Sequence, residues 1–252
     1  MSAGEPMTLQ ADARTTSDEC PEGVVRLWRP GLVEYGRALE WQHARAAGLH
    51  AGSEGEALVL LEHPPVYTLG ARGNDSNLLA TPRALAAFGA QVVHTDRGGD
   101  VTFHGPGQLV AYPILDLRGR GIGAARYVRM LEAVMLEAVA RFGVQAERVR
   151  GRPGVWVDGA KLGAVGVRVS RGVSRHGLAL NVSTDLEWFA RIVPCGIPDI
   201  EATSLARLLG EAPAMEEVED ALAEAFAREF GCTLVAASWD APAPAALAGA
   251  AS

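Results

Sequence analysis

Lys161 is the residue whose type most strongly suggests chemistry. The chain has 23 basic residues, and 22 of them are arginine, so Lys161 is its only lysine. A guanidinium stays protonated in proteins, whereas the pKa of a desolvated lysine can fall toward neutrality, so this position suggests a need for an amine that exchanges a proton. The alternative is a lysine that extends its ammonium to solvent and has no chemical role.

Cys195 is the second candidate, because it lies in a loop between Pro194 and Gly196 rather than in an apolar repeat. Proline fixes the backbone before the cysteine and glycine frees it afterwards, an arrangement that presents a side chain. A thiolate there would be a nucleophile, and a nearby lysine ammonium would lower the thiol pKa. Taken alone, a loop cysteine is more often a small buried hydrophobic residue.

The third candidate is the glycine-rich stretch RGGDVTFHGPGQ at residues 97–108. Its glycines let backbone approach a ligand closely, so its amides could line an acyl chain or hold an oxyanion, while Arg97 or His104 fixes a polar end. Two tight turns would explain the glycines equally well, and a lone histidine is more often structural. A structural role is also favoured for His176, which opens the strand-like HGLALNVS at 176–183.

The charge of the chain limits its partners. A net charge of −7 argues against general nucleic-acid binding, because phosphate contacts need a basic surface. Arginines are nevertheless concentrated at 148–152 and 168–175, where they could attract an acidic partner protein. Scattered, solvated arginines are an equally good interpretation.

The sequence also indicates a compartment and excludes some cofactors. Cys20, Cys195 and Cys232 have neither disulfide nor zinc-ligand spacing, which suits a reducing cytoplasm. No apolar run approaches the roughly 18 residues of a membrane helix, so we expect a soluble protein. No cluster of ligand residues has metal-binding spacing, so we expect no metal. No phosphate loop or dinucleotide fingerprint is present either.

The elements that must position these residues alternate between strand and helix within one domain. We expect a disordered lead-in at 1–22, a folded domain at 23–235 and a flexible tail rich in alanine and proline at 236–252. Apolar periodicity predicts strands at 24–28, 57–63 and 232–235, and helices at 32–47, 123–142, 186–193, 204–209 and 215–230.

The stretch 154–170 is predicted to be a β-hairpin, because Asp158-Gly159 is a favoured two-residue turn between two β-rich runs. Strict alternation along the second run would place Lys161 on the same face as Val165, Val167 and Val169. That face is expected to be buried, which makes a lysine there unusual.

Five blocks, taken together and in this order, closely resemble the lipoyl(octanoyl) transferase family. They cover nearly all of the predicted domain, and together they are far more specific than any one of them. The blocks are HPPVYTLG at 63–70, RGGDVTFHGPGQ at 97–108, GVWVDGAKLGAVGV at 154–167, HGLALNV at 176–182 and IVPCGI at 192–197.

The resemblance implies an α+β fold, that of the biotin and lipoate protein ligase catalytic domains, with a mixed β-sheet flanked by helices and a smaller sheet. It also implies transfer of octanoyl from acyl carrier protein to a lysine of lipoyl domains, in dehydrogenase complexes or the glycine cleavage H protein. No cofactor is expected beyond the phosphopantetheine of the carrier protein. We expect a monomer.

The resemblance also implies the site residues. Cys195 would carry the acyl group as a thioester, and Lys161 would lower its pKa. The implied substrate-binding residues are Arg97, Gly98, Gly99, Asp100, Val101, Thr102, Phe103, His104, Ala164, Val165, Gly166, Gly177, Leu178 and Ala179. Two positions depart from the usual pattern, since Phe103 replaces a tyrosine and Ala202 replaces a valine.

Two other functions remain open at this point. An ATP-dependent lipoate or biotin ligase would share the fold, but its nucleotide-binding lysine and glycine-rich loop would be expected, whereas this chain has HGPG after the RGG block and a PCG cysteine. A degenerate acyl-binding or lipoyl-domain-docking module would have no need of both Cys195 and Lys161.

Overall fold

The computed structural model describes residues 23–193 and 201–239. The predicted lead-in at 1–22, most of the predicted tail and the segment that contains Cys195 lie outside the described residues. Within the part of the chain that the structure describes, no helix is long and apolar enough to cross a membrane.

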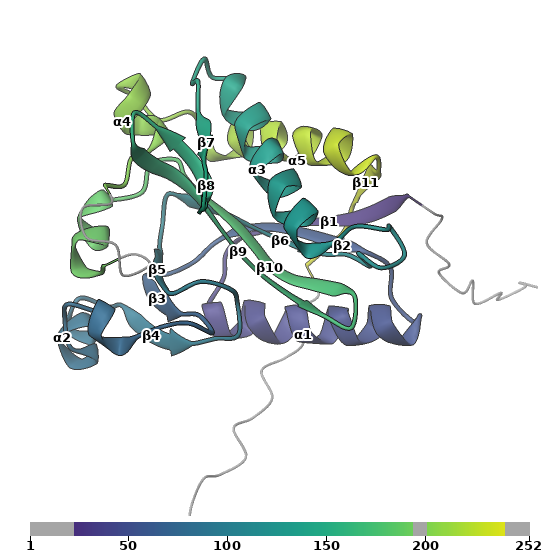
Figure 1. Ribbon diagram of the computed structural model, residues 1–252, viewed down its shortest axis with the longest axis horizontal. Coiled ribbons are helices and arrows are strands. Elements are labelled where there is room, and N and C mark those ends of the chain that lie inside the picture. Colours follow the sequence, from purple (N-terminus) through teal and green to yellow (C-terminus); the bar gives the residue numbers. More distant parts are fainter. Residues whose placement is uncertain (1–22, 194–200, 240–252) are drawn as a thin grey trace, which may run out of the picture.

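A large mixed β-sheet forms the centre of the fold (Figure 1). Its eight strands follow the order β11-β1-β2-β6-β10-β9-β8-β7. The β1 strand pairs in parallel with both β2 and β11, and the pairs from β2 through β6, β10 and β9 to β7 are antiparallel. The strands are β1 (Val24–Leu32), β2 (Ala57–Glu62), β6 (Gln108–Ile114), β7 (Glu147–Val149), β8 (Arg152–Val157), β9 (Ala160–Ser170), β10 (Val173–Asn181) and β11 (Thr233–Ala236).

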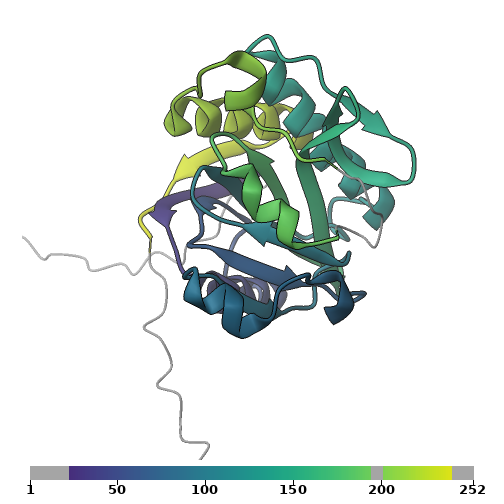
Figure 2. The ribbon, with the colours of Figure 1, turned by 90° about the vertical axis from the view of Figure 1, so that its left-hand side faces the viewer.

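A smaller sheet of order β4-β3-β5 joins the large one through the connection from β5 to β6. It contains β3 (Val66–Leu69), β4 (Gln91–His94) and β5 (Val101–His104). A separate apolar cluster, which includes Tyr67 and Phe103, packs it against the short helix α2 (Pro82–Ala87) and the 3₁₀ helix η2 (Leu186–Arg191). Figure 2 shows this sheet and α2 together at one end of the molecule.

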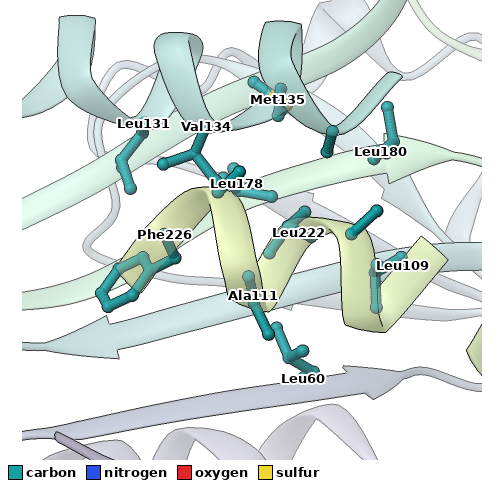
Figure 3. Close-up of a cluster of buried hydrophobic side chains, with 14 of the residues drawn as sticks. Leu60, Leu109, Ala111, Leu131, Val134, Met135, Leu178, Leu180, Leu222 and Phe226 are labelled. Carbon is teal, nitrogen blue, oxygen red and sulfur yellow. The ribbon is translucent and has the colours of Figure 1, made fainter. Parts of the chain in front are cut away.

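Helices cover both faces of the large sheet (Figures 1 and 2). On one face lie α3 (Ala124–Ala140) and α5 (Met215–Phe230), whose Leu131, Val134, Leu222 and Phe226 pack on sheet residues to form the main core (Figure 3). On the other face lies α1 (Tyr35–Ala51). The remaining short helices are α4 (Leu205–Leu209) and the 3₁₀ helix η1 (Asp75–Asn77).

The apolar face of α3 explains why this helix forms where the sequence predicts it. Buried residues recur along it at spacings of three and four, as an amphipathic helix on a sheet requires. The predicted helix at 215–230 matches α5 at both ends. The first predicted helix begins three residues late, at Tyr35 rather than 32, because β1 continues to Leu32.

Packing also continues past the predicted domain end at 235. Ala236 is the last residue of β11, and the amide of Ala237 donates to the carbonyl of Leu27 at 2.8 Å. Trp239 stacks on Trp41 of α1, with ring centroids 5.3 Å apart. The first residues of the predicted tail therefore pack against the domain.

Candidate active site

A cavity of about 570 Å³ lies against β9 and β10, at the junction of the two sheets. Its walls come from both sheets, from Tyr35 at the start of α1 and from Val128 of α3. All the predicted substrate-binding residues except Phe103 line it. Loops and strands that are far apart in sequence, at 97–104, 161–167 and 176–181, thus meet around one space.

Phe103 is not part of the cavity lining. Its ring stacks on Trp188 at a centroid distance of 5.1 Å and lies 5.2 Å from the ring of Tyr67, inside the apolar cluster of the smaller sheet. It supports the wall from behind instead of lining the cavity.

Lys161 lines the cavity, but the face predicted for it is wrong. The pairing of β8 with β9 shifts register, so that Val155 pairs with Gly163 while the next residue, Trp156, pairs with Lys161. The extra residue is Leu162, which is fully buried in the main core. This β-bulge interrupts the alternation and turns Lys161 away from the core, on the opposite face from Val165.

The Lys161 ammonium lies over the Trp156 ring, with Nζ 4.7 Å from the ring centroid. An indole face attracts a cation at that distance. The backbone of Lys161 is fixed as well, since its amide donates to Glu201 at 2.8 Å and its carbonyl accepts from the amide of Thr203 at 2.9 Å.

Cys195 lies outside the described residues, which end at Val193 before it and resume at Glu201 after it. Both flanking residues are fixed by backbone hydrogen bonds: the carbonyl of Glu201 accepts from the amide of Lys161, and the amide of Val193 donates to the carbonyl of Asn77 at 2.8 Å. Ala202, which departs from the usual family residue, lines the cavity and bridges to Lys161.

The guanidinium of Arg97 shapes the glycine-rich loop. Its Nη2 donates to the carbonyl oxygens of Thr68 at 2.5 Å and Asp100 at 2.7 Å, and its Nε donates to the Thr68 hydroxyl at 3.0 Å. The next residue, Gly98, donates to the carbonyl of Val167 at 2.8 Å and so attaches the loop to β9. Arg97 therefore fixes the loop through neutral acceptors.

The imidazole ring of His104 is held in its neutral form, with Nε2 as the acceptor. Its Nδ1 lies 2.6 Å from Oε1 of Gln108, whose amide nitrogen donates to Asn181 at 2.8 Å. Because Gln108 offers its oxygen, Nδ1 carries the proton and Nε2 carries a lone pair. Burial lowers the pKa of His104 to about 3, which keeps the ring neutral at physiological pH.

His176 is held in the same charge state by a different contact. Its Nε2 lies 2.8 Å from Oδ1 of Asp96, so Nε2 carries the proton and Nδ1 is the acceptor. Nδ1 is buried and has no hydrogen-bond partner among the described residues. Burial lowers the pKa of His176 to about 4, despite the nearby carboxylate. Partial burial would by itself raise the pKa of Asp96, but hydrogen bonds from His176 and Arg175 lower it below its ordinary value.

Two tyrosines that the sequence analysis missed also line the cavity, Tyr35 and Tyr112. The Tyr112 hydroxyl lies 2.8 Å from Nε2 of His63, whose Nδ1 donates to the carbonyl of Val33 at 2.6 Å. Tyr35 packs edge-on against His63 and stacks parallel to His104. Neither tyrosine stands in a recognisable motif, so only the fold brings them to the site.

The cavity is basic although the chain is acidic. Arg72, Arg97, Arg152 and Lys161 line it, together with a single carboxylate, that of Asp100. Three other arginines of these stretches contact carboxylates, since Arg148 pairs with Glu132, and Arg168 and Arg175 share Asp96. The charged side chains of the cavity lining are therefore mostly positive.

Comparison with known proteins assigns the family. The family model described as the lipoyl protein ligase A/B catalytic domain matches residues 34–227. The chain belongs to this family. An octanoyltransferase of Acidobacterium capsulatum is 47% identical over 223 residues, which cover 82% of this chain and 91% of that protein. An octanoyltransferase of Chloroflexus aggregans is 51% identical over 195 residues, covering 76% of this chain and 88% of that one. The resemblance stated from the motifs is confirmed.

Solved structures of the family share the fold at low identity. Protein Ta0514 of T. acidophilum, solved with bound lipoic acid, aligns with a TM-score of 0.67 and 14% identity, covering 85% of this chain and 89% of that one. A lipoate-protein ligase A bound with ATP aligns with a TM-score of 0.67 and 14% identity, covering 87% of this chain and 90% of that one. The predicted fold is therefore confirmed.

Proposed function

We propose that this member of the lipoyl protein ligase A/B family is an octanoyltransferase that moves an octanoyl group from acyl carrier protein to a lysine of a lipoyl domain. One observation carries the proposal. The only lysine of the chain lines the cavity, and its backbone pairs with residues 201–203, at the end of the segment that contains Cys195. The octanoyltransferases that are about half identical to this chain support the choice of acyl group.

In the first step, the Cys195 thiolate attacks the carbonyl carbon of the octanoyl thioester. Backbone amides near the site stabilise the oxyanion of the tetrahedral intermediate. The carbon–sulfur bond to pantetheine then breaks, and the Lys161 ammonium gives its proton to the departing thiolate. An octanoyl thioester on Cys195 and a neutral Lys161 result.

In the second step, the lysine amine of the lipoyl domain attacks this thioester. Neutral Lys161 accepts a proton from the attacking nitrogen, the amide bond forms and the Cys195 thiolate leaves. The face of the Trp156 ring lies beside Nζ of Lys161 and attracts the ammonium form, in which Lys161 is left at the end of this step. Aminolysis of a thioester runs downhill, so the proposed reaction needs neither ATP nor another cofactor.

The basic lining of the cavity supports an acidic protein as donor. Arg72 and Arg152 are exposed residues that also line the cavity, so they lie where a carrier protein would deliver its pantetheine arm. Positive charge at an entrance speeds the encounter with a negatively charged partner.

The test is transfer to a purified lipoyl domain, followed by the mass of that domain. With octanoyl-acyl carrier protein and no nucleotide, we expect the domain to gain one octanoyl group. Lys161→Arg should slow the transfer at least 100-fold, since loss of a general acid–base commonly costs about 10²–10⁴-fold. The matched Arg126→Lys exchange, at an exposed position of α3, should leave the rate unchanged.

A ligase would behave differently in the same assay. It would modify the domain only with free octanoate and ATP, and that outcome would overturn the proposed function. Binding of the acyl donor without transfer would instead indicate a docking module.

A further inference from the structure

A chain of buried hydrogen bonds begins at His104 and runs toward Lys161. Nδ1 of His104 donates to Oε1 of Gln108 at 2.6 Å, and Nε2 of Gln108 donates to Oδ1 of Asn181 at 2.8 Å. Nδ2 of Asn181 in turn donates to the carbonyl oxygen of Thr203 at 2.9 Å. All four residues are at most 7% exposed, so the chain is shielded from water, where hydrogen bonds are stronger.

The chain continues through backbone groups to Lys161. The amide of Thr203 donates to the carbonyl of Lys161 at 2.9 Å, and the amide of Lys161 donates to the carbonyl of Glu201 at 2.8 Å. Ala202 lies between these two bonds and forms a parallel β-bridge with Lys161. From His104 to Glu201, each residue therefore donates to the next one along the chain.

The position of Asn181 explains why a side chain makes this link. The β10 strand ends at Asn181, and its pairing with β9 stops one residue earlier, at Leu180 and Gly163, where the bulge begins. At Lys161, residues 201–203 lie beside β9 instead of β10. The amide of Asn181 thus joins β10 to these residues at the point where the backbone ladder is interrupted.

The direction of the Asn181 amide is fixed by its neighbours. Nε2 of Gln108 also donates to the carbonyl of Phe103 at 3.3 Å, so Gln108 presents a donor to Asn181. A reversed Asn181 amide would place its nitrogen against that donor and its oxygen against the carbonyl of Thr203. Since both contacts would then be lost, only one arrangement satisfies these buried groups.

We propose that Asn181 is a positioning residue for acyl transfer, which holds the backbone of Lys161 in place through Thr203. The inference rests on the proposed function, in which Lys161 exchanges a proton during the reaction. The ammonium of a lysine lies at the end of a flexible four-carbon stem, so it can be aimed only from a fixed backbone. A displacement of about 1 Å can slow a reaction on the order of 10²-fold.

The test is a double-mutant cycle that measures octanoyl transfer from acyl carrier protein to a lipoyl domain. Asn181→Ala removes the donor to Thr203, and its effect is compared in wild type and in Lys161→Arg. We expect kcat per folded protein to fall tenfold or more in wild type and less than twofold in Lys161→Arg, because no amine is left to position there. A general loss of structure would lower kcat in both backgrounds alike.

The matched control is Ser174→Ala, on the same strand and outside the cavity lining. The buried Ser174 hydroxyl donates to the carbonyl of Pro113 at 2.8 Å and accepts from the amide of Leu115 at 2.9 Å. Its loss should lower the melting temperature and leave kcat unchanged.

Two results would overturn the positioning role while wild type still transfers octanoyl. One is an unchanged kcat in Asn181→Ala, and the other is an equal fall in both backgrounds. If wild type transferred no octanoyl, the proposed function itself would fail. If Asn181→Ala were too unstable to purify, Asn181→Ser, whose side chain is too short to bridge Gln108 and Thr203, would take its place in the same cycle.

Discussion

At the scale of single residues, three buried histidines are kept neutral around the cavity. Burial lowers the pKa of His63 and His176 to about 4 and that of His104 to about 3, from the ordinary value of 6.5. Between about pH 4 and 6.5 the unfolded chain therefore binds protons at these positions that the folded chain does not bind. The stability that they contribute is fully present above pH 6.5 and is lost as the pH falls.

We predict that the free energy of unfolding decreases from pH 6.5 to pH 5, by up to about 1.4 kcal/mol per pH unit for each histidine that stays neutral. Urea titrations across this range measure it. Glu219 acts in the opposite direction, because burial raises its pKa to about 7 and its protonation favours the folded state. Glu219→Gln should therefore make the decrease steeper. A stability that is flat or rises toward pH 5 in that variant would contradict the neutral histidines.

Some of these residues could be found from sequence and others could not. Lys161 stands out because it is the only lysine, and its place in the cavity agrees with that signal. His176 was interpreted as structural, since nothing in its neighbours shows that its backbone is left-handed. Tyr35 and Tyr112 give no signal at all, because their position in the cavity depends on packing between elements that are distant in sequence.

At the scale of elements, the pairing of β10 with β6 depends on glycine at 177. A Cβ at this position would overlap the carbonyl oxygen and carbon of Ala111 and the ring of Pro113. Backbone atoms of a central strand cannot move without breaking the sheet, so the cost cannot be relaxed locally.

We predict that Gly177→Ala lowers the free energy of unfolding by about 3 kcal/mol or more, as overpacking against a rigid core does at its upper range. The matched control is Gly36→Ala in α1, where an added Cβ meets no atom within 4 Å. It should stabilise the protein by about 0.5–1 kcal/mol, through the higher helix propensity of alanine. Similar melting temperatures for the two variants would contradict the close approach of β6 and β10.

The hairpin of β8 and β9 shows what pattern reading can and cannot predict. Asp158 and Gly159 form its turn as predicted, with φ of 48° and 82°. The bulge at Leu162 was not predicted, because strict alternation assumes that no residue is inserted. That single residue decides that Lys161 faces the cavity and not the core.

At the scale of the whole molecule, the fold class and the family followed from the sequence because five motifs occur in a fixed order. The order in which the strands pair could not be predicted from the sequence, since β1 lies between two strands that are far apart in the chain. The domain end at 235 was predicted from composition, which carries no information about the contact of Trp239 with Trp41. Single aromatic residues in a biased segment can thus extend a domain.

The thioester at Cys195 is the central step of the proposed mechanism, and the mass of the intact protein after incubation with octanoyl-acyl carrier protein tests it most directly. Wild type should gain one octanoyl group that hydroxylamine removes, without ATP. Cys195→Ser should gain no hydroxylamine-sensitive group, whereas the matched Cys232→Ser, at a half-buried thiol outside the cavity, should be acylated like wild type. The absence of any adduct on wild type, or its persistence as a thioester in Cys195→Ser, would contradict the mechanism.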